Sequence, residues 1–482
     1  MNEVGAVAGI CLACGVWCGC SASNGANAPP AGAPEGGGGA CTQSAPAWGA
    51  SLMRIDGGDA QKNQFAHLGF DAAGNAVAVW ERADIGSGQV TLWSATRNAQ
   101  GTWSAPIQID GTSGMSAPPD SQIAVAAGGT AIAVWQGGST GGSYTLPYAA
   151  VYDGSKWGPP TLLHADVAPT TASTNIVPRV AILASGDAIV AFAFDDGAPD
   201  SSHPDYDQQI YVVRYTGGAW GAPARLSTYD GTYQGSGQPA VAMAASGDAV
   251  VVWDQTYVQN QPGDGDRVLV ARVPAGSVAA TGPAFVDTKG SDVAKTPAVA
   301  VDGSGNATVA WIDHQGTTGA WASRLPAGSL QGTPTPLDVG APGPNAADVV
   351  LAVDVNAAVT AVWRDSANDP RAIWTNRFTG GAWTGAVALE TNDSGATNPA
   401  LALDDAGDAM AVWESGAGIK AAYLSVGGTS WGSPSVLDPA ASTSGNADVA
   451  FAHGCPRALA LWTEGSGQSG GNGSEIDSAS YE

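Results

Sequence analysis

Carboxylates recur at fixed places in this sequence, and their spacing is the feature most able to do chemistry. One series follows apolar segments that end in Trp or Phe: Glu81, Asp195, Asp254, Asp313, Asp365, Glu414 and Glu464. A second series follows other short apolar segments: Asp56, Asp110, Asp287, Asp338, Glu390 and Asp438. Two rings of carboxylates on one face would concentrate negative potential and bind a cation or a cationic ligand. The alternative is that acids at strand ends cap turns with their own side chains.

The densest acidic region lies between residues 195 and 266 and predicts a metal site. Hard oxygen ligands at alternating positions suit Ca²⁺, and the candidates are Asp200, Asp205, Asp207, Asp264 and Asp266. Neither acidic segment follows the twelve-residue calcium loop, so a solvated acidic loop is the alternative. Ca²⁺ is the one cofactor that the sequence suggests.

Motifs for common catalytic machinery are missing from the sequence. Its five histidines are scattered and form no zinc motif, and neither a nucleophile elbow nor a phosphate-binding loop occurs. The net charge of −25 excludes nucleic acid as a partner, because binding to phosphates needs a basic surface. It also disfavours adhesion to an anionic membrane surface. These features favour a monomeric binding protein over an enzyme, with a carbohydrate or a protein as its ligand.

An internal repeat places the acids. Apolar segments of a similar pattern end at Trp80, Trp135, Phe192, Trp253, Trp311, Trp363, Trp413 and Trp462, which makes eight copies. In each copy a first strand precedes a tight turn, where a glycine supplies the positive φ in six copies and Ala357 or Pro456 replaces it in the other two. No helical periodicity of useful length occurs, so the chain is predicted to be all-β.

Third and fourth strands complete each copy. The fourth strand opens with a second Trp at Trp103, Trp157, Trp220, Trp383 and Trp431, whereas the fourth and fifth copies lack it. Eight copies of four strands predict an eight-bladed β-propeller. Loops that join strands two to three, and one blade to the next, are long and should share one face, where binding usually occurs.

The two ends of the chain predict how the propeller closes. An isolated strand-like segment at 47–56 precedes the first copy, and the eighth copy stops after its third strand near Tyr481. We therefore expect the N-terminal strand to complete the last blade. Cys41 and Cys455 would then lie on the same face of that blade, which predicts a disulfide that an exported protein can keep. Two free thiols are the alternative.

The N-terminus predicts export. Residues 1–20 contain a short apolar segment followed by small residues, as in a signal peptide, and residues 21–45 form a Gly/Pro/Ala-rich tether ahead of the propeller at 46–482. Cys20 after Gly19 resembles the lipidated cysteine of bacterial lipoproteins, and Cys14 is the weaker candidate. The protein is therefore expected to be exported, and to contact the membrane only through a lipid anchor.

Segments 98–103 and 153–157 resemble the Asp-box of sialidase-like propellers, which lies between strands three and four. This resemblance implies the propeller fold and, as an activity, glycoside hydrolysis by an arginine cluster, a Tyr/Glu pair and an acid. No matching set of three arginines occurs; Arg179 and Arg457 are isolated. The favoured hypothesis is thus a tethered binding scaffold that uses its acidic loop face, and a sialidase-like glycoside hydrolase is the alternative.

Overall fold

The structure is a computed structural model. It describes residues 47–49, 52–58, 61–87, 89–111, 120–138, 145–164, 176–195, 208–227, 233–257, 265–287, 294–314, 318–339, 345–365, 371–393, 395–438, 445–453, 457–465 and 474–482. The predicted signal segment, the tether and the Cys41–Cys455 pair lie outside these residues.

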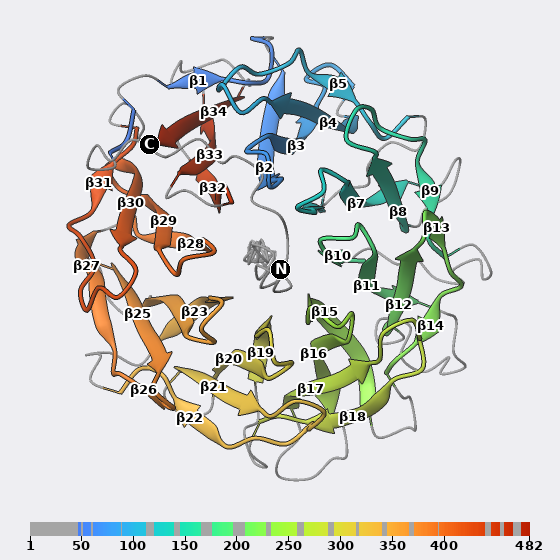
Figure 1. Ribbon diagram of the computed structural model, residues 1–482, viewed down its shortest axis with the longest axis vertical. Coiled ribbons are helices and arrows are strands. Elements are labelled where there is room, and N and C mark those ends of the chain that lie inside the picture. Colours follow the sequence, from blue (N-terminus) through green and yellow to red (C-terminus); the bar gives the residue numbers. More distant parts are fainter. Residues whose placement is uncertain are drawn as a thin grey trace, which may run out of the picture.

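The prediction of an all-β protein is confirmed: every regular element in the described ranges is a strand. Within the same ranges, none of the elements is a helix able to cross a membrane. The strands form seven hydrogen-bonded sheets, arranged radially around a common centre (Figure 1). We number the strand groups as repeats 1 to 8, following the copies in the sequence.

Six sheets hold one repeat each, and all their main strand pairs are antiparallel. Repeat 2 contains β6 (Ser121–Val125), β7 (Ala131–Gly138), β8 (Thr145–Tyr152) and β9 (Thr161–Leu162). Repeat 3 contains β10 (Arg179–Ile182), β11 (Ala188–Asp195), β12 (Gln208–Thr216), β13 (Ala219–Trp220) and β14 (Ala224–Arg225). Repeat 4 contains β15 (Tyr233–Met243), β16 (Ala249–Tyr257), β17 (Gly265–Val273) and β18 (Thr281–Phe285).

The next three repeats continue the same order from the centre outward. Repeat 5 contains β19 (Ala294–Val301), β20 (Ala307–Asp313), β21 (Gly319–Leu325) and β22 (Pro334–Pro336). Repeat 6 contains β23 (Ala346–Val353), β24 (Val359–Asp365), β25 (Arg371–Thr379), β26 (Ala382–Trp383) and β27 (Val387–Asp393). Repeat 7 contains β28 (Thr397–Leu403), β29 (Ala409–Ser415), β30 (Gly418–Leu424) and β31 (Ser435–Val436).

The seventh sheet has eight strands and holds the first and last repeats together. Repeat 1 contains β2 (Lys62–Phe70), β3 (Ala76–Ala83), β4 (Val90–Arg97) and β5 (Ile107–Gln108). Repeat 8 contains β32 (Gly445–Phe451), β33 (Ala458–Gly465) and β34 (Ser474–Tyr481), and β1 (Met53–Arg54) pairs antiparallel with β34. One parallel pairing, Lys62 with Ser474, joins the two repeats.

Large aromatic side chains form the core between repeats. The Trp within the second strand is at most 1% exposed in seven repeats, and Phe192 takes its place in repeat 3. The buried apolar clusters each combine residues of two consecutive repeats; one of them unites Val250 and Val252 of repeat 4 with Val309 and Trp311 of repeat 5. Burial of this kind stabilises by roughly 25 cal/mol per Å² of apolar surface.

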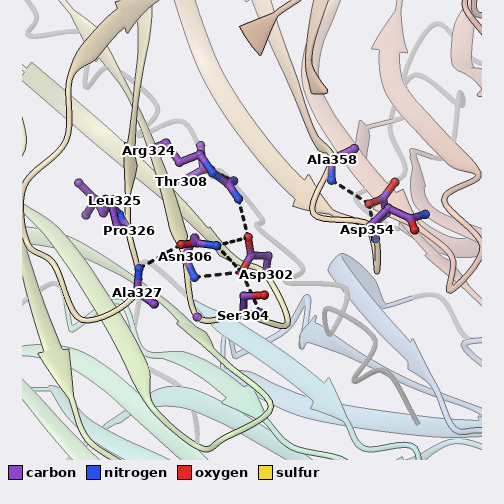
Figure 2. A network of polar contacts seen from close by, with 12 residues as sticks. Asp302, Ser304, Asn306, Thr308, Arg324, Leu325, Pro326, Ala327, Asp354 and Ala358 are labelled. Atoms are coloured by element: carbon purple, nitrogen blue, oxygen red, sulfur yellow. Dashed lines mark hydrogen bonds and ion pairs between the residues drawn. The ribbon is translucent and has the colours of Figure 1, made fainter. Parts of the chain in front are cut away.

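The tight turn between the first two strands takes its shape from a carboxylate and a positive φ. In repeat 5, Asp302 Oδ1 accepts hydrogen bonds from the amides of Ser304 (3.0 Å) and Asn306 (2.9 Å), and Arg324 contacts the other oxygen (Figure 2). Gly305 has φ 83° there, and Ala357 keeps the left-handed conformation with φ 63° in repeat 6. The expected turn is therefore present even where glycine is not.

Buried arginines tie repeat 3 to repeat 4 and repeat 4 to repeat 5. Arg214 donates to the carbonyl oxygens of Gly247 (3.0 Å), Val273 (3.0 Å), Pro274 (2.9 Å) and Ser277 (2.6 Å). Arg272 makes the corresponding contacts to Gly305, Leu325, Pro326 and Ser329. Both recipient turns have a Pro-Ala-Gly-Ser sequence, at 274–277 and 326–329. A guanidinium group with five N–H donors suits such a set of carbonyls.

Replacing Arg214 with Met should lower the free energy of unfolding by roughly 3 kcal/mol, because several charge-assisted hydrogen bonds disappear and buried carbonyl oxygens lose their donor. Urea unfolding monitored by circular dichroism measures this change. Arg225→Met, at an exposed position of the same repeat, is the control and should change stability by less than about 0.5 kcal/mol. Equal effects of the two substitutions would contradict a special role for Arg214.

Candidate functional site

A cavity is lined by the inner strands of repeats 7, 8, 1, 2 and 3. The labelled strands β28, β32, β2 and β10 of these repeats face the centre in Figure 1. The empty space of the cavity measures about 550 Å³, open solvent included. We call it the axial cavity. It is lined by Phe65, His67, Asp120, Ser121, Gln122, Arg179, Asn398, Pro399, Ala400, Asn446, Ala447 and Asp448. These residues lie in the first half of their inner strands, where the connections from the preceding repeats arrive.

A β-bulge in the inner strands shapes this wall. Pairing of β2 with β3 shifts register between Gln64 and His67, and Phe65 within the bulge has φ 52°. The same position is left-handed in repeats 7 and 8, where Asn398 has φ 47° and Asn446 has φ 53°. Asn tolerates this conformation, whereas Phe adopts it rarely and at an energetic cost. A bulge redirects the side chains beside it, here toward the cavity.

The residue type two places after the bulge differs between two groups of repeats. Aligned on the tight turns, this position is Ala240, Ala298, Val350 and Ala400 in repeats 4 to 7. In repeats 8, 1, 2 and 3 it is Asp448, His67, Gln122 and Arg179. The centre is therefore apolar at this level on one side and polar on the other.

Arg179 and Asp120 form a buried ion pair in the polar half. Arg179 Nη1 lies 3.0 Å from Asp120 Oδ1 and 3.2 Å from Oδ2, and it also donates to the Pro178 carbonyl oxygen at 2.9 Å. Their residues are 8% and 1% exposed. Burial raises the pKa of the Asp120 carboxyl to about 6, against the opposing effects of Arg179 and His67. The carboxyl can thus exchange a proton near neutral pH.

His67 and Asp448 make the second pair. His67 Nδ1 lies 3.3 Å from Asp448 Oδ2, which also accepts a hydrogen bond from the Leu68 amide at 3.3 Å. Asp448 Oδ1 accepts from its neighbour Val449 at 2.8 Å. These contacts hold the imidazole of repeat 1 against the carboxylate of repeat 8 at the cavity wall.

Two of the acids predicted from the sequence accept hydrogen bonds from residues that line this cavity. Glu81 Oε1 accepts from Ser121 Oγ of the next repeat at 3.1 Å. Glu414 Oε1 accepts from Asn398 Nδ2 at 2.8 Å and from the Asn446 amide of the next repeat at 2.6 Å. Burial, followed by the charge of Asp120, raises the pKa of Glu81 well above its ordinary range. Both acids therefore position cavity residues from behind.

The other predicted acids are distributed around the ring. Asp313, Asp365 and Glu464 come two residues after their Trp, whereas Glu81, Asp254 and Glu414 come one residue after it. Because side chains alternate along a strand, the two groups point to opposite faces of their sheets. Burial and a hydrogen bond with Glu464 raise the pKa of Asp477 to about 8. The structure describes the backbone of Asp195 but not its side chain.

The predicted metal ligands are described only at Asp266. Its Oδ2 lies 2.7 Å from Lys295 Nζ, and its Oδ1 accepts from Thr256 Oγ1 at 2.6 Å. Asp200, Asp205, Asp207 and Asp264 lie outside the described residues. Across the ranges that the structure does describe, no three His, Cys, Asp or Glu side chains come together as a metal site.

Several acids of the second series serve as structural hydrogen-bond acceptors. Asp56 is 1% exposed and accepts from Arg54 Nε (2.7 Å), the Gly58 amide (3.1 Å) and Asn63 Nδ2 (2.8 Å). Asp287, 7% exposed, accepts from Arg267 Nε at 2.6 Å. At Asp56 the bond from the Gly58 amide is that of the capping alternative, whereas Asp287 forms a buried ion pair with a neighbouring strand.

The pH dependence of stability should reveal the buried acid Asp254. Burial, followed by the charge of Asp266, raises its pKa from 3.8 to about 7. Between these values the folded state keeps a proton that the unfolded state releases, so stability falls as pH rises. Asp254→Asn should remove this loss. The difference in stability between the variant and the wild type should therefore shift in favour of the variant by roughly 2 kcal/mol from pH 5 to pH 8.

Urea unfolding at the two pH values tests this prediction. Asp153→Asn is the control, because hydrogen bonds from Ser155 and Lys156 lower the pKa of Asp153 to about 2, far below both measurements. That substitution should have the same effect at pH 5 and pH 8. A similarly pH-independent effect of Asp254→Asn would show that its carboxyl ionises normally.

Comparison with known proteins finds similarity in structure. The sequence matches no protein-family model and no curated protein sequence. The lectin BP39L from Burkholderia pseudomallei superposes with a TM-score of 0.51 at 14% identity, over 78% of this chain and 100% of the lectin. A polysaccharide lyase, an ulvan lyase, gives 0.48 at 11% identity over 80% of this chain and 95% of that one. The Hadza microbial sialidase Hz136 gives 0.39 at 14% identity, over 70% and 73%. The architecture is that of a β-propeller.

Proposed function

We propose that this protein is an eight-bladed β-propeller that binds a carbohydrate in its axial cavity. The observation that carries the proposal is the composition of that cavity: planar polar side chains and one partly exposed aromatic ring converge on the inner strands of neighbouring repeats. The lectin with the same fold supports this choice, since it is a carbohydrate-binding protein.

Each repeat is one blade in this proposal, and the N-terminal segment completes the eighth. Met53 and Arg54 pair with Ser478 and Asp477, and Trp48 forms a bridge with Tyr481, their ring centroids 5.3 Å apart. A buried cluster also unites Leu459 and Leu461 of repeat 8 with Trp80 of repeat 1. These contacts support a ring joined by its two ends, which would leave no large sheet edge exposed.

The polar side chains that line the axial cavity have the chemistry that sugar hydroxyls require. Asn398 and Asn446 each carry an amide with donors and an acceptor, and the hydrogen bonds of Arg179 described above all come from Nη1. Planar side chains of this kind can bind two adjacent hydroxyl groups at once. The ring of Phe65, half-buried, can face the apolar side of a pyranose. A purely apolar ligand would leave the amide and guanidinium groups unused.

The cellular setting belongs to the same proposal. The apolar segment within residues 1–20 and the cysteine at position 20 support export and a lipid anchor, and the tether at 21–45 would hold the propeller away from the membrane. A propeller presented in this way could capture soluble or cell-surface glycans.

A second candidate function is glycoside hydrolysis, and the raised pKa of Asp120 favours it. A carboxyl with a pKa of about 6 keeps part of its protons near neutral pH and can act as a general acid. Asp448, across His67 from Asp120, would be the second carboxylate that such enzymes require. The ion pair between Asp120 and Arg179 makes binding the stronger candidate, because it engages both oxygens of the acid.

Binding is tested by incubating the full chain with an immobilised glycan panel and measuring the affinity of each retained glycan by calorimetry. Arg179→Lys keeps the positive charge but loses the planar guanidinium, and His67→Ala removes the imidazole; each should weaken binding at least about tenfold. Arg225→Lys, at an exposed position, should bind like the wild type. A panel without any retained glycan, or wild-type affinity in both cavity variants, would disprove the proposal.

Fluorogenic glycosides distinguish the hydrolase from the binding protein. Hydrolysis through Asp120 predicts turnover that falls as pH rises through about 6 and that Asp120→Asn reduces at least about 100-fold. His67→Ala should still turn over slowly, since it leaves the acid in place. Glycan binding without any turnover at pH 4 to 8 would assign binding as the function of the cavity.

A further inference from the structure

The axial cavity carries more negative than positive charge. Two carboxylates line it, Asp120 and Asp448, and the one arginine among its lining residues, Arg179, contacts both oxygens of Asp120 through Nη1. The charges of Asp120 and Arg179 therefore balance each other. Asp448 faces His67, whose imidazole is positively charged only when it is protonated. The carboxylate of Asp448 thus gives the cavity a negative potential.

Glu414 adds a further negative charge beside the cavity. Its Oε1 accepts hydrogen bonds from Asn398 Nδ2 (2.8 Å) and from the Asn446 amide (2.6 Å), and both donors are neutral. In repeat 6 the residue after the Trp of the second strand is Arg364, which forms an ion pair with Asp348 at the left-handed bulge position. The corresponding residues of repeat 7 are Glu414 and Asn398, so repeat 7 keeps a charge that repeat 6 neutralises.

The contact with Glu414 also decides what Asn398 offers to a ligand. Because Nδ2 donates to Glu414, the amide group has its acceptor, Oδ1, at the other position. Oδ1 of this half-buried side chain receives no hydrogen bond from the residues that the structure describes. Asn398 therefore adds an acceptor to the carboxylate oxygens that line the same cavity.

An ammonium group fits these acceptors better than a metal ion does. Among the described residues, no three His, Cys, Asp or Glu side chains come together as metal ligands. An ammonium group brings three N–H donors of its own together with its charge, so it needs no closed shell of protein ligands. Its hydrogen bonds are charge-assisted and are about twice as strong as those between neutral groups.

We propose that the axial cavity selects carbohydrates that carry a free amino group. The sugar ammonium donates to Asn398 Oδ1 and is attracted by the carboxylates of Asp448 and Glu414. This inference rests on the proposed carbohydrate-binding function and names the class of sugar for the same site. Acetylation of the amine removes its charge and two of its three donors, and a sugar carboxylate would be repelled by the acids. Both changes should therefore weaken binding.

Three trisaccharides of the same ring and linkage test the proposal: glucosamine trisaccharide, its fully N-acetylated form, and cellotriose, which carries a hydroxyl in place of the amine. In calorimetry on the full chain, the amino trisaccharide should bind at least about tenfold more tightly than either neutral one. Raising NaCl from about 50 mM to about 500 mM should weaken the amino trisaccharide at least about threefold and leave the neutral ones unchanged, because salt screens the attraction between charges.

Asp448→Asn removes the charge and keeps the shape of the side chain. The quantity to compare is the ratio of the affinities for the amino and the N-acetylated trisaccharide, since a general disturbance of the cavity lowers both affinities and leaves their ratio unchanged. In Asp448→Asn this ratio should fall to below about three. Asp153→Asn removes a carboxyl from an exposed turn and is the matched control, with the ratio of the wild type.

Several outcomes would overturn the proposal and leave carbohydrate binding in place. They are a neutral trisaccharide that binds as tightly as the amino one, an unchanged ratio in Asp448→Asn, and no binding of the amino trisaccharide while other glycans of the panel are retained. Hexylamine binding as tightly as the amino trisaccharide would also overturn it, because a cation without a sugar ring would then suffice. Should Asp448→Asn fail to fold, the three trisaccharides on the wild-type protein still decide. A panel without any retained glycan would refute the carbohydrate-binding function itself.

Discussion

Contact between neighbouring repeats is the constraint on which the remaining structure depends. A four-stranded sheet has two faces, and an isolated repeat of this chain could bury neither of them. The Trp of the second strand packs between one repeat and the next and so buries these faces. Trp80, Trp253 and Trp462 are all fully buried. Polar groups reinforce the same contacts: Arg214 and Arg272 donate to carbonyl oxygens of the following repeat, and Glu414 accepts an amide from it. The axial cavity is likewise lined by consecutive repeats, from repeat 7 through repeats 8, 1 and 2 to repeat 3.

The axial cavity is polar on one side because the repeats differ in residue type at one inner-strand position. Two residues after the inner-strand bulge, repeats 4 to 7 keep Ala or Val, whereas repeats 8, 1, 2 and 3 carry Asp448, His67, Gln122 and Arg179. A fully symmetric ring would place identical side chains around the centre and could not present donors and acceptors on one side only.

The sequence was sufficient to predict the strands and the tight turns that the structure describes, because those features repeat from copy to copy. Ala357 shows the strength of this signal, since it adopts the positive φ of its glycine counterparts. The site was harder to predict, because His67, Asp120 and Asp448 lie in different copies and belong to no repeated pattern. For His67 and Asp448 the signal was a polar residue at an inner-strand position where repeats 4 to 7 have Ala or Val, whereas Asp120 lies two residues before that position. The bulge at Phe65, which shifts register and decides which side chains face the cavity, left no clear mark in the sequence.

The buried ionisable groups near the centre lower the stability of the folded protein, and this effect bears on their role. Burial raises the pKa of Asp120 and of Asp254, and raises that of Glu81 well above the ordinary range, so each acid makes the folded state less stable at neutral pH than a neutral side chain of similar shape would. Gln136 shows that the position of Glu81 can be filled by an amide, because its Oε1 accepts the Ile176 amide of the next repeat at 3.0 Å. Connecting two repeats therefore does not require a carboxyl at this position. Glu81 accepts a hydrogen bond from Ser121 at the wall of the axial cavity, and the charge of Asp120 adds to burial in raising the pKa of Glu81. The same position thus connects two repeats with an amide in repeat 2 and with a carboxyl in repeat 1, and the carboxyl makes stability depend on pH.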